Sequence, residues 1–585
     1  NNVAVGGGAL ITDTLGSKTV AIGTDALSAQ NFTTATDSFN TAVGYRAGVA
    51  VTTATSNNLI GGLSGDALTT GSFNQTLGVV ALSADTAGNR SVAIGHGALL
   101  TQNFTTSTDV YNIAIGHNAG LAVTTGFFNT IVGGLAGDAL TTGRNTVAVG
   151  TSALSTDTKG QRSVAIGTDA LNAQNFTTAV DTFNTAVGTN AGLSNTTGTE
   201  NTFLGMDSGR SQTDADGNVA IGYASMFNNT NGEKNVAVGR GTLVAMNYAT
   251  ATDGFNVAIG YDAGNDITVG VQNTLIGGLT GDAITEGARN VAVGKSALSA
   301  DTLGARATAI GFQALASQNF TTATENYNVG VGYGAGESVT TGIKNTIVGG
   351  LAGDGLTEGN ENTAIGFGAL TTDSKGSRSV AVGEQALAVQ NFTTATNSLN
   401  VGIGFQAGAA VSTGTSNTLI GAFAGDAMTT GAGNTAVGIN SIGVGATTGN
   451  FNTAVGQASG LGITSGANNT LLGTDAGRAG SPGGNIQTAS NRIGLGDENV
   501  TEAHIQVDWT VASDARDKTD FTALDLGLDF VKSLAPVTYK WDKRSKYGDK
   551  TADGYDLNDQ TPDGTHKEDW LDIGFKAQEV EALEQ

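Results

Sequence analysis

Short stretches of alternating residues recur along the first 475 or so positions of the chain. In "KTVAIG", Val20 and Ile22 lie on one face and Thr19 and Ala21 on the other, which is the period of a β-strand. Gly23 ends this stretch, and a glycine ends most of the later copies. Because glycine adopts turn conformations that other residues avoid, the pattern predicts many short strands, each followed by a turn.

The spacing of these marker glycines is regular. Three equal short steps follow one longer step, as the first markers show: Gly6, Gly23, Gly44, Gly61, Gly78 and Gly95. One long and three short steps make a larger block, so that Gly23 corresponds to Gly95 and Gly167. The long step contains the phrase "QNFTTAT", which returns with small changes at Gln30, Gln102, Gln174, Met246, Gln318 and Gln390. The phrase is therefore a four-residue insertion in every fourth repeat.

The short repeat between neighbouring markers, as from Gly44 to Gly61, is too short for a domain or a helical hairpin. A strand, a turn, a second short segment and another turn make one coil of a β-solenoid, in which each coil pairs with the next. Proline, which would interrupt such pairing, is absent before Pro482. We expect an all-β shaft over residues 1–484, of roughly 27 coils and about 130 Å. A constant register argues against the alternative, a globular β-sandwich.

The core of each coil is expected to be thin, because Val, Ile and Leu alternate with Ala and Gly. The pattern predicts that the larger residues face inward and that alanines such as Ala21, Ala42, Ala93 and Ala114 face outward. A flat alanine surface would let another chain pack closely, which favours an oligomer.

Composition excludes several classes of protein. The chain of 585 residues has 88 Gly, 3 Pro and no Cys, so collagen and disulfide scaffolds are excluded. A formal charge of −24 argues against nucleic-acid partners. No apolar run reaches the ~18 residues of a membrane span, so we expect no membrane insertion. Because the chain opens at Asn1 without a methionine, we expect that a preceding part is missing.

The phrases "SVAIGTDAL", "NTAVGYRAG" and "NTAVGQASG" resemble the repeats of trimeric autotransporter adhesin heads. Similar repeats occur in fibres of tailed bacteriophages. The resemblance covers residues 1 to about 475 and implies a left-handed parallel β-roll that assembles as a homotrimer. The adhesin coils are shorter than these, so the corner geometry is not carried over.

The composition changes after "GSPGGN". From here onward lie all prolines and tryptophans of the chain, Pro482, Trp509, Pro536, Trp541, Pro562 and Trp570. "TALDLGLDFVKSL" has the apolar spacing of a helix, and "PVTYKW" that of a strand. We expect a connector over residues 485–512 and a separate small α+β domain over 513–585.

Three phrases of this domain, "SDARDK", "LDFVKSLAPVTYKW" and "IGFKAQEVEAL", resemble the intramolecular chaperone at the end of phage tail fibres and tailspikes. The resemblance implies that the domain trimerises, guides folding of the fibre and in many members cuts itself off. Ser513 then matches the nucleophile and Lys518 its base, with supporting positions Asp514 and Arg516 and a cut at the Ser513–Asp514 junction. The family normally continues after "AQEVE", so we expect an incomplete domain.

A serine hydroxyl needs a base to remove its proton, and a lysine serves once burial lowers its pKa. Attack by Ser513 on its own carbonyl would close a strained four-membered ring. Two routes stay open: a neighbouring chain supplies the hydroxyl, or the attack falls on the carbonyl of Ala512. The competing interpretation of "SDARDK" is a polar turn before a helix.

One aromatic residue recurs in each insertion, at Phe32, Phe104, Phe176, Tyr248, Phe320 and Phe392. An aromatic ring among Asn and Thr suits stacking on a sugar of a host receptor. It suits equally a loop whose ring covers the thin core, which is the interpretation that we favour.

The sequence predicts no metal and no cofactor. "GGLAGDALT" nearly matches a calcium-binding β-roll, but related phrases occur once a block, at Asp66, Asp138, Asp282, Asp354 and Asp426, instead of in consecutive coils. "VGKS" lacks the first glycine of a phosphate-binding loop, since position 289 is Arg289. The four histidines are scattered.

We therefore expect a structural tail fibre on a phage virion, a homotrimer that contacts a host glycan or protein receptor. It would join other tail proteins through the missing N-terminal part. The alternatives are a trimeric adhesin on a bacterial surface, or the shaft of a polysaccharide-degrading tailspike whose enzyme domain is missing.

Overall fold

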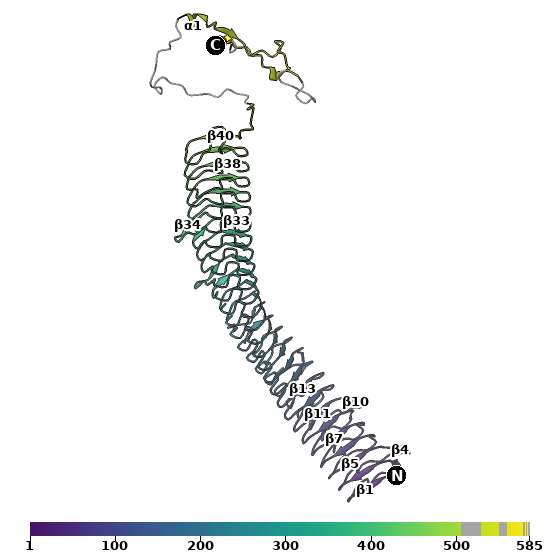
Figure 1. Ribbon diagram of the computed structural model, residues 1–585. Coiled ribbons are helices and arrows are strands. Elements are labelled where there is room, and N and C mark those ends of the chain that lie inside the picture. The colour runs from purple at the N-terminus through teal and green to yellow at the C-terminus, as the bar shows by residue number, and fades with distance from the viewer. Residues whose placement is uncertain (505–527, 549–558, 577–578, 581, 583–585) are drawn as a thin grey trace. The chain divides into compact units, whose positions relative to one another are not determined.

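A computed structural model of the chain forms two compact units, Asn1–Thr501 and Glu502–Gln585. The structure describes residues 1–504, 528–548, 559–576, 579–580 and 582. The first unit is a stack of coils, as Figure 1 shows, and each unit is described separately below.

The first unit is a parallel β-solenoid, as the sequence predicts. Each coil adds one three-residue strand to a single parallel sheet of 28 strands. These strands are β1 (Val3–Val5), β3 (Val20–Ile22), β5 (Thr41–Val43), β6 (Asn58–Ile60), β7 (Gln75–Leu77), β9 (Val92–Ile94), β11 (Ile113–Ile115), β12 (Thr130–Val132), β13 (Val147–Val149), β15 (Val164–Ile166), β17 (Thr185–Val187), β18 (Thr202–Leu204), β19 (Val219–Ile221), β21 (Val236–Val238), β23 (Val257–Ile259), β24 (Thr274–Ile276), β25 (Val291–Val293), β27 (Thr308–Ile310), β29 (Val329–Val331), β30 (Thr346–Val348), β31 (Thr363–Ile365), β33 (Val380–Val382), β35 (Val401–Ile403), β36 (Thr418–Ile420), β37 (Thr435–Val437), β38 (Thr453–Val455), β39 (Thr470–Leu472) and β40 (Ile493–Leu495).

The direction of the strand side chains differs from the expectation. Ala21, Ala42, Ala93 and Ala114 are fully buried, whereas the flanking Val and Ile residues lie on the outside of the sheet. The interior of a coil is narrow, and most coils have alanine at the central strand position and place larger buried residues, such as Leu27 and Leu99, outside the strands. Where a large residue replaces the central alanine, glycines make room for it: a Cβ on Gly48 would lie 2.6 Å from Cδ1 of Leu59.

Two series of equivalent residues, the marker glycines and the asparagines before the strands, form continuous ladders from coil to coil. Marker glycines have positive φ, such as 132° at Gly205, and a Cβ there would lie 2.7 Å from the carbonyl oxygen of Gly222 in the next coil. Most strands are preceded by a buried asparagine whose side-chain oxygen accepts a hydrogen bond from the backbone of the next coil. The backbone amide of Asn57, for example, donates to Oδ1 of Asn40 at 2.9 Å. These ladders explain why the phrase N-T-A-V-G recurs.

Each insertion adds a short strand that pairs with the preceding coil. The six two-stranded parallel sheets are β2 (Gly16–Ser17) with β4 (Thr36–Asp37), β8 (Gly88–Asn89) with β10 (Thr108–Asp109), β14 (Gly160–Gln161) with β16 (Val180–Asp181), β20 (Gly232–Glu233) with β22 (Thr252–Asp253), β26 (Gly304–Ala305) with β28 (Thr324–Glu325), and β32 (Gly376–Ser377) with β34 (Thr396–Asn397). The insertion is thus part of the stack.

The shaft extends beyond the boundary at residue 484 that composition suggested. Strand β40 still pairs in parallel register with β39, Leu495 beside Leu472, and the compact unit ends at Thr501. Part of the expected connector over 485–512 therefore belongs to the solenoid.

The second unit contains a helix and a small sheet within its described residues. Helix α1 (Leu528–Ser533) precedes β41 (Val537–Tyr539), which pairs antiparallel with β42 (Asp572–Gly574), and the 3₁₀ helix η2 (Arg544–Lys546) lies between them. This agrees with the strand expected from "PVTYKW" and with the second half of the helix expected from "TALDLGLDFVKSL", whose first half, residues 522–527, lies outside the described residues.

Candidate functional sites on the shaft and in the C-terminal unit

The aromatic residues of the insertions are buried. Phe32, Phe104, Phe176, Tyr248, Phe320 and Phe392 are each 4–8% exposed. A Cβ on Gly16 would lie 2.8 Å from Cδ2 of Phe32, so the ring packs against strand β2 of its own chain. The ring holds the insertion on the shaft and presents no open face. At the tip of the first insertion, Thr33, Thr34 and Ala35 are exposed.

In five of the six blocks a carboxylate anchors the insertion beside the ring. In the second block, Asp85 Oδ1 accepts from the backbone amides of Gly88 at 3.1 Å and Phe104 at 3.0 Å. Its Oδ2 accepts from Nε2 of Gln102 at 2.7 Å. Gln102 Oε1 accepts in turn from Nδ2 of Asn112 at 2.9 Å, which joins the anchor to the asparagine ladder.

This arrangement recurs in five of the six blocks, where a carboxylate bonds to the glutamine of the next coil; the carboxylates are Asp13, Asp85, Asp157, Asp301 and Asp373. The fourth block differs at three positions together. Asn229 replaces the aspartate, Met246 the glutamine and Tyr248 the phenylalanine. The hydroxyl of Tyr248 donates to the carbonyl of Gly270 at 2.7 Å and accepts from Asn256 Nδ2 at 3.2 Å. This second solution has no charge.

Burial raises the pKa of the Asp85 carboxyl, and hydrogen bonds from Phe104 and Gln102 oppose that shift. Burial likewise raises the pKa of Asp157, Asp301 and Asp373. Burial also raises the pKa of the Tyr248 hydroxyl to about 12. The four carboxyls lie against their own chain, so they serve the fold and not a reaction.

The exposed aromatic residues of the insertions lie seven positions later, at Phe39, Tyr111, Phe183, Phe255 and Tyr327. They are 46–53% exposed and have left-handed backbone, with φ of 50° at Phe39. Sequence reasoning missed them, although they recur at the same interval as the buried rings. The signal that separates the two sets is the buried asparagine that directly follows each exposed ring.

These rings belong to a longer row of side chains, here named the entry row. It consists of the residue two positions before each three-residue strand of the 28-stranded sheet. Besides the rings it contains the cations Lys18, Arg90, Arg162, Lys234, Arg289, Arg306, Lys344 and Arg378. Five of these eight cations lie over rings of the row: the Arg90 guanidinium, for example, lies 5.0 Å from the Phe73 ring centre and 5.5 Å from that of Tyr111. Most of them also pair with an acid, as Lys18 does with Asp37 at 2.7 Å.

A second row, here named the exit row, consists of the two residues after each marker glycine. It contains the aromatic residues Tyr45, Tyr223, Tyr261, Phe312, Tyr333, Phe367 and Phe405 and the acids Asp25, Asp169 and Glu384. Neighbouring coils stack these side chains: Phe312 and Tyr333 have ring centres 5.4 Å apart and nearly parallel planes. His96 and His117 stack in the same way at 5.5 Å.

Between the two rows runs the outer face of the 28-stranded sheet. The first and third residue of each strand point outward, and most are Val, Ile, Leu or Thr. Many of the third residues are 37–51% exposed, among them Ile22, Ile60, Leu77, Ile166, Leu204, Ile259, Ile276 and Ile310. A continuous apolar band of this length is a typical protein interface.

The repeated acids Asp66, Asp138, Asp282, Asp354 and Asp426 do not gather into a calcium site. Successive copies are at least four coils apart, and among the described residues no group of three or more acidic or histidine side chains could hold a metal ion. Ser83 donates to Asp66 at 2.5 Å, and burial raises the pKa of Asp138, Asp282 and Asp426. In the described part of the chain, no helix has the length and apolar character that crossing a membrane requires.

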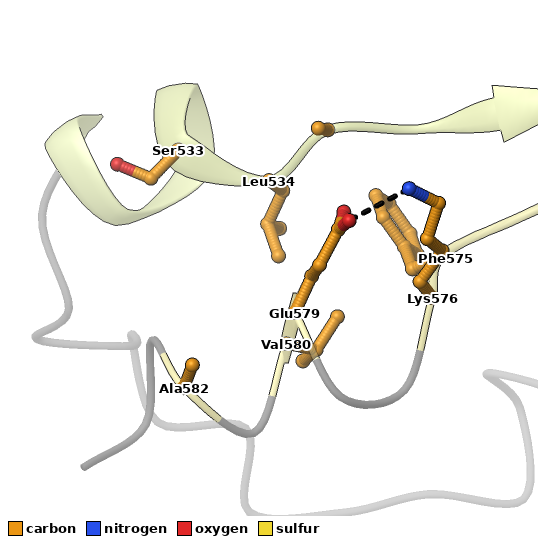
Figure 2. A pocket seen from close by; sticks show the side chains of 8 residues that line it. Ser533, Leu534, Phe575, Lys576, Glu579, Val580 and Ala582 are labelled. Carbon is orange, nitrogen blue, oxygen red and sulfur yellow. Dashed lines mark hydrogen bonds and ion pairs between the residues drawn. The ribbon is translucent and has the colours of Figure 1, made fainter.

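The expected cleavage residues Ser513, Asp514, Arg516 and Lys518 lie outside the described residues. The described part of the C-terminal unit has a hollow of about 270 Å³, lined by residues at the end of helix α1 and by Phe575, Lys576, Glu579, Val580 and Ala582. Figure 2 shows Leu534, Phe575 and Val580 around it, with an ion pair of 2.7 Å between Lys576 Nζ and Glu579 Oε1.

The fold and these surfaces define a repeat protein of the parallel β-solenoid class with a separate C-terminal unit. Residues 513–584 match the family described as the chaperone of endosialidase. No curated protein matches the chain. The family match agrees with the resemblance drawn from "SDARDK" and the phrases after it, and it covers the C-terminal unit alone.

Proposed function

We propose that this chain is the shaft of a trimeric fibre whose C-terminal unit guides assembly. The observation that carries the proposal is the apolar outer face of the 28-stranded sheet. A β-sheet that exposes Val and Ile along its whole length gains free energy when the band leaves water, at ~25 cal/mol per Å². Three parallel copies around one axis would cover the band on every chain, since each would turn the same face inward.

The first test concerns the outer face. Ile259→Lys combined with Ile276→Lys places two charges on neighbouring coils of the band, and we expect loss of the trimer in sedimentation velocity. Thr125→Lys combined with Thr142→Lys is the matched control, because these residues are exposed and lie outside the strands. A stable monomer of the unaltered protein would contradict the proposal, as would a trimer that the isoleucine substitutions leave intact.

The C-terminal family match supports an assembly role for residues 513–584. Three long stacks of similar coils can associate with their coils misaligned in many ways. A trimer formed first by the C-terminal units would align the three chains before the shafts associate. We expect the protein without residues 513–585 to accumulate as misassembled or insoluble shaft. Soluble trimers of normal register, seen by electron microscopy, would show that the shaft assembles unaided.

We assign the fibre to the tail of a bacteriophage virion, where it contacts a glycan or protein receptor of the host. The support is the combination of a repetitive shaft with a chaperone of this family. The insertions are the candidate receptor contacts, with the tip residues outward and the rings of Phe32 and its equivalents holding the loops in place. Binding of purified trimer to host cells, compared with trimers whose six tips are replaced by glycine and serine, tests this role.

Self-cleavage by Ser513 and Lys518 is part of the same proposal, with the family match as its support. The alternative functions are a bacterial surface adhesin and the shaft of a tailspike enzyme, and the complete reading frame of the gene distinguishes them.

A further inference from the structure

We propose that the entry row of one chain packs on the exit row of the next chain, so that the two rows form the seams of the trimer. This inference rests on the proposed trimer and adds which residues meet. Both rows border the same apolar face, one before each strand and one after it. When three such faces turn toward a common axis, the entry row of each chain lies next to the exit row of the neighbouring chain.

The rings of the entry row favour a protein partner over a sugar. A sugar stacks on the open face of an aromatic ring. Here both faces of the Tyr111 ring have a neighbour, since Arg90 lies against it and its centre is 5.8 Å from that of Phe128. Phe39, Phe183 and Phe255 each have a cation of the same row over the ring, which leaves less ring face open to a sugar.

In three coils the charges of the two rows are complementary at the same level of the stack. The coil that contributes Lys18 to the entry row contributes Asp25 to the exit row, and the same holds for Arg162 with Asp169 and Arg378 with Glu384. None of these three acids makes an ion pair within the described residues, whereas other exit-row acids do, such as Asp207 with Arg210. In a parallel trimer with its axis along the rod, equal coils lie at equal height, so Arg162 of one chain meets Asp169 of the next.

Two coils provide contrasting cases, because each has a cation in both rows. The coil of Lys234 carries Arg240 in its exit row, and the coil of Arg289 carries Lys295, so a cation would oppose a cation at these two levels. Arg240 lies instead between the rings of Tyr223 and Tyr261, at 5.7 and 5.6 Å from their centres. Its charge is directed along its own row, which leaves this level of the seam to aromatic contacts.

The absence of cysteine from the chain permits a direct test. Arg162→Cys and Asp169→Cys are introduced together, and the protein is oxidised under native conditions. Within one chain, strand β15 (Val164–Ile166) alone separates the two positions by ~10 Å. A disulfide requires Cα atoms within about 7 Å, so a disulfide between these positions must join two chains.

We expect a covalent trimer on a non-reducing gel, and no covalent product from either single substitution. Arg162→Cys with Thr177→Cys is the matched control, because Thr177 is exposed at the tip of the insertion in the same block. A trimer in sedimentation that yields no covalent product would overturn the seam and leave the proposed fibre standing. Equal cross-linking of the control pair would also overturn the seam, and a monomer would overturn both.

Discussion

Asp85 and Gln102 form a fully buried hydrogen bond of 2.7 Å across two successive coils, carboxylate to side-chain amide. The bond recurs in five blocks and is replaced in the fourth by a neutral set, Asn229, Met246 and Tyr248. Both sets of residues hold an insertion on the stack, whose interior has little apolar volume.

The two sets are expected to be exchangeable only as units. Asp85→Asn turns one acceptor into a donor that faces the Nε2 group of Gln102, so an unpaired buried donor should cost ~1–3 kcal/mol. Adding Gln102→Met and Phe104→Tyr reproduces the fourth block and should restore most of the loss. Calorimetry and hydrogen exchange at the amides of Gly88 and Phe104 measure both effects.

The reverse change is the control for that exchange. Asn229→Asp, with Met246 unchanged, buries a carboxylate that has no glutamine in the next coil, and it faces the Oε1 atom of Gln212, which lies 3.5 Å from Asn229 Nδ2. We expect this substitution to destabilise the fourth block at neutral pH. If Asp85→Asn alone were as stable as the unaltered protein, the hydrogen bond to Gln102 would carry no weight.

The buried carboxyls predict a dependence of stability on pH. The pKa of Asp85, Asp157, Asp301 and Asp373 is raised above the ordinary value of 3.8, so the folded shaft binds protons more readily than the unfolded chain. Their contribution to stability is complete below about pH 3.8 and is lost as the pH rises through the folded pKa values.

The measurement compares the unaltered protein with a variant that has the neutral set in these four blocks. Relative to the variant, the unaltered protein should lose melting temperature as the pH rises from acid to neutral. Surface acids whose pKa is lowered, such as Asp37, are present in both proteins and cancel. A constant difference across this range would contradict the prediction.

The marker glycines are expected to tolerate no side chain. At Gly205, φ is positive and a Cβ would lie 2.7 Å from the carbonyl oxygen of the next coil, so Gly205→Ala should cost ~1–3 kcal/mol through strain and overpacking. Gly134→Ala is the matched control, since nothing lies within 4 Å of its Cβ position. Equal melting curves for the two variants would show that neighbouring coils can move apart at a marker glycine and would contradict the prediction.

The two sets of aromatic residues should respond differently to truncation. Phe176→Ala removes a ring that is 6% exposed and should cost ~3–5 kcal/mol, enough to release the insertion of its block. Phe183→Ala removes a ring that is 49% exposed and should leave the loop closed. Limited proteolysis between residues 177 and 181 reports the difference, with faster cutting for the first variant only.

Self-cleavage predicts a fragment that ends next to Ser513. Ser513→Ala and Lys518→Met should each abolish the fragment, because the first lacks the hydroxyl and the second cannot accept its proton. Both variants should still form trimers. Mass spectrometry that finds the same cut in Ser513→Ala would assign it to another protease.

The sequence by itself determined the solenoid, its short repeat within a larger block and the place of the insertions, because these depend on local rules of alternation and turns. It also separated the C-terminal unit, through a change in composition and specific phrases. Which way the strand residues face was decided only by the tertiary structure. Alternation defines two faces without naming the inner one, and the width of the coil places Ala21 inside and Ile22 outside. The same holds for the aromatic residues. Phe32 and Phe39 recur at the same interval, and although Asn40 after Phe39 distinguishes the two positions in the sequence, the tertiary structure was needed to show that the first is buried and the second exposed.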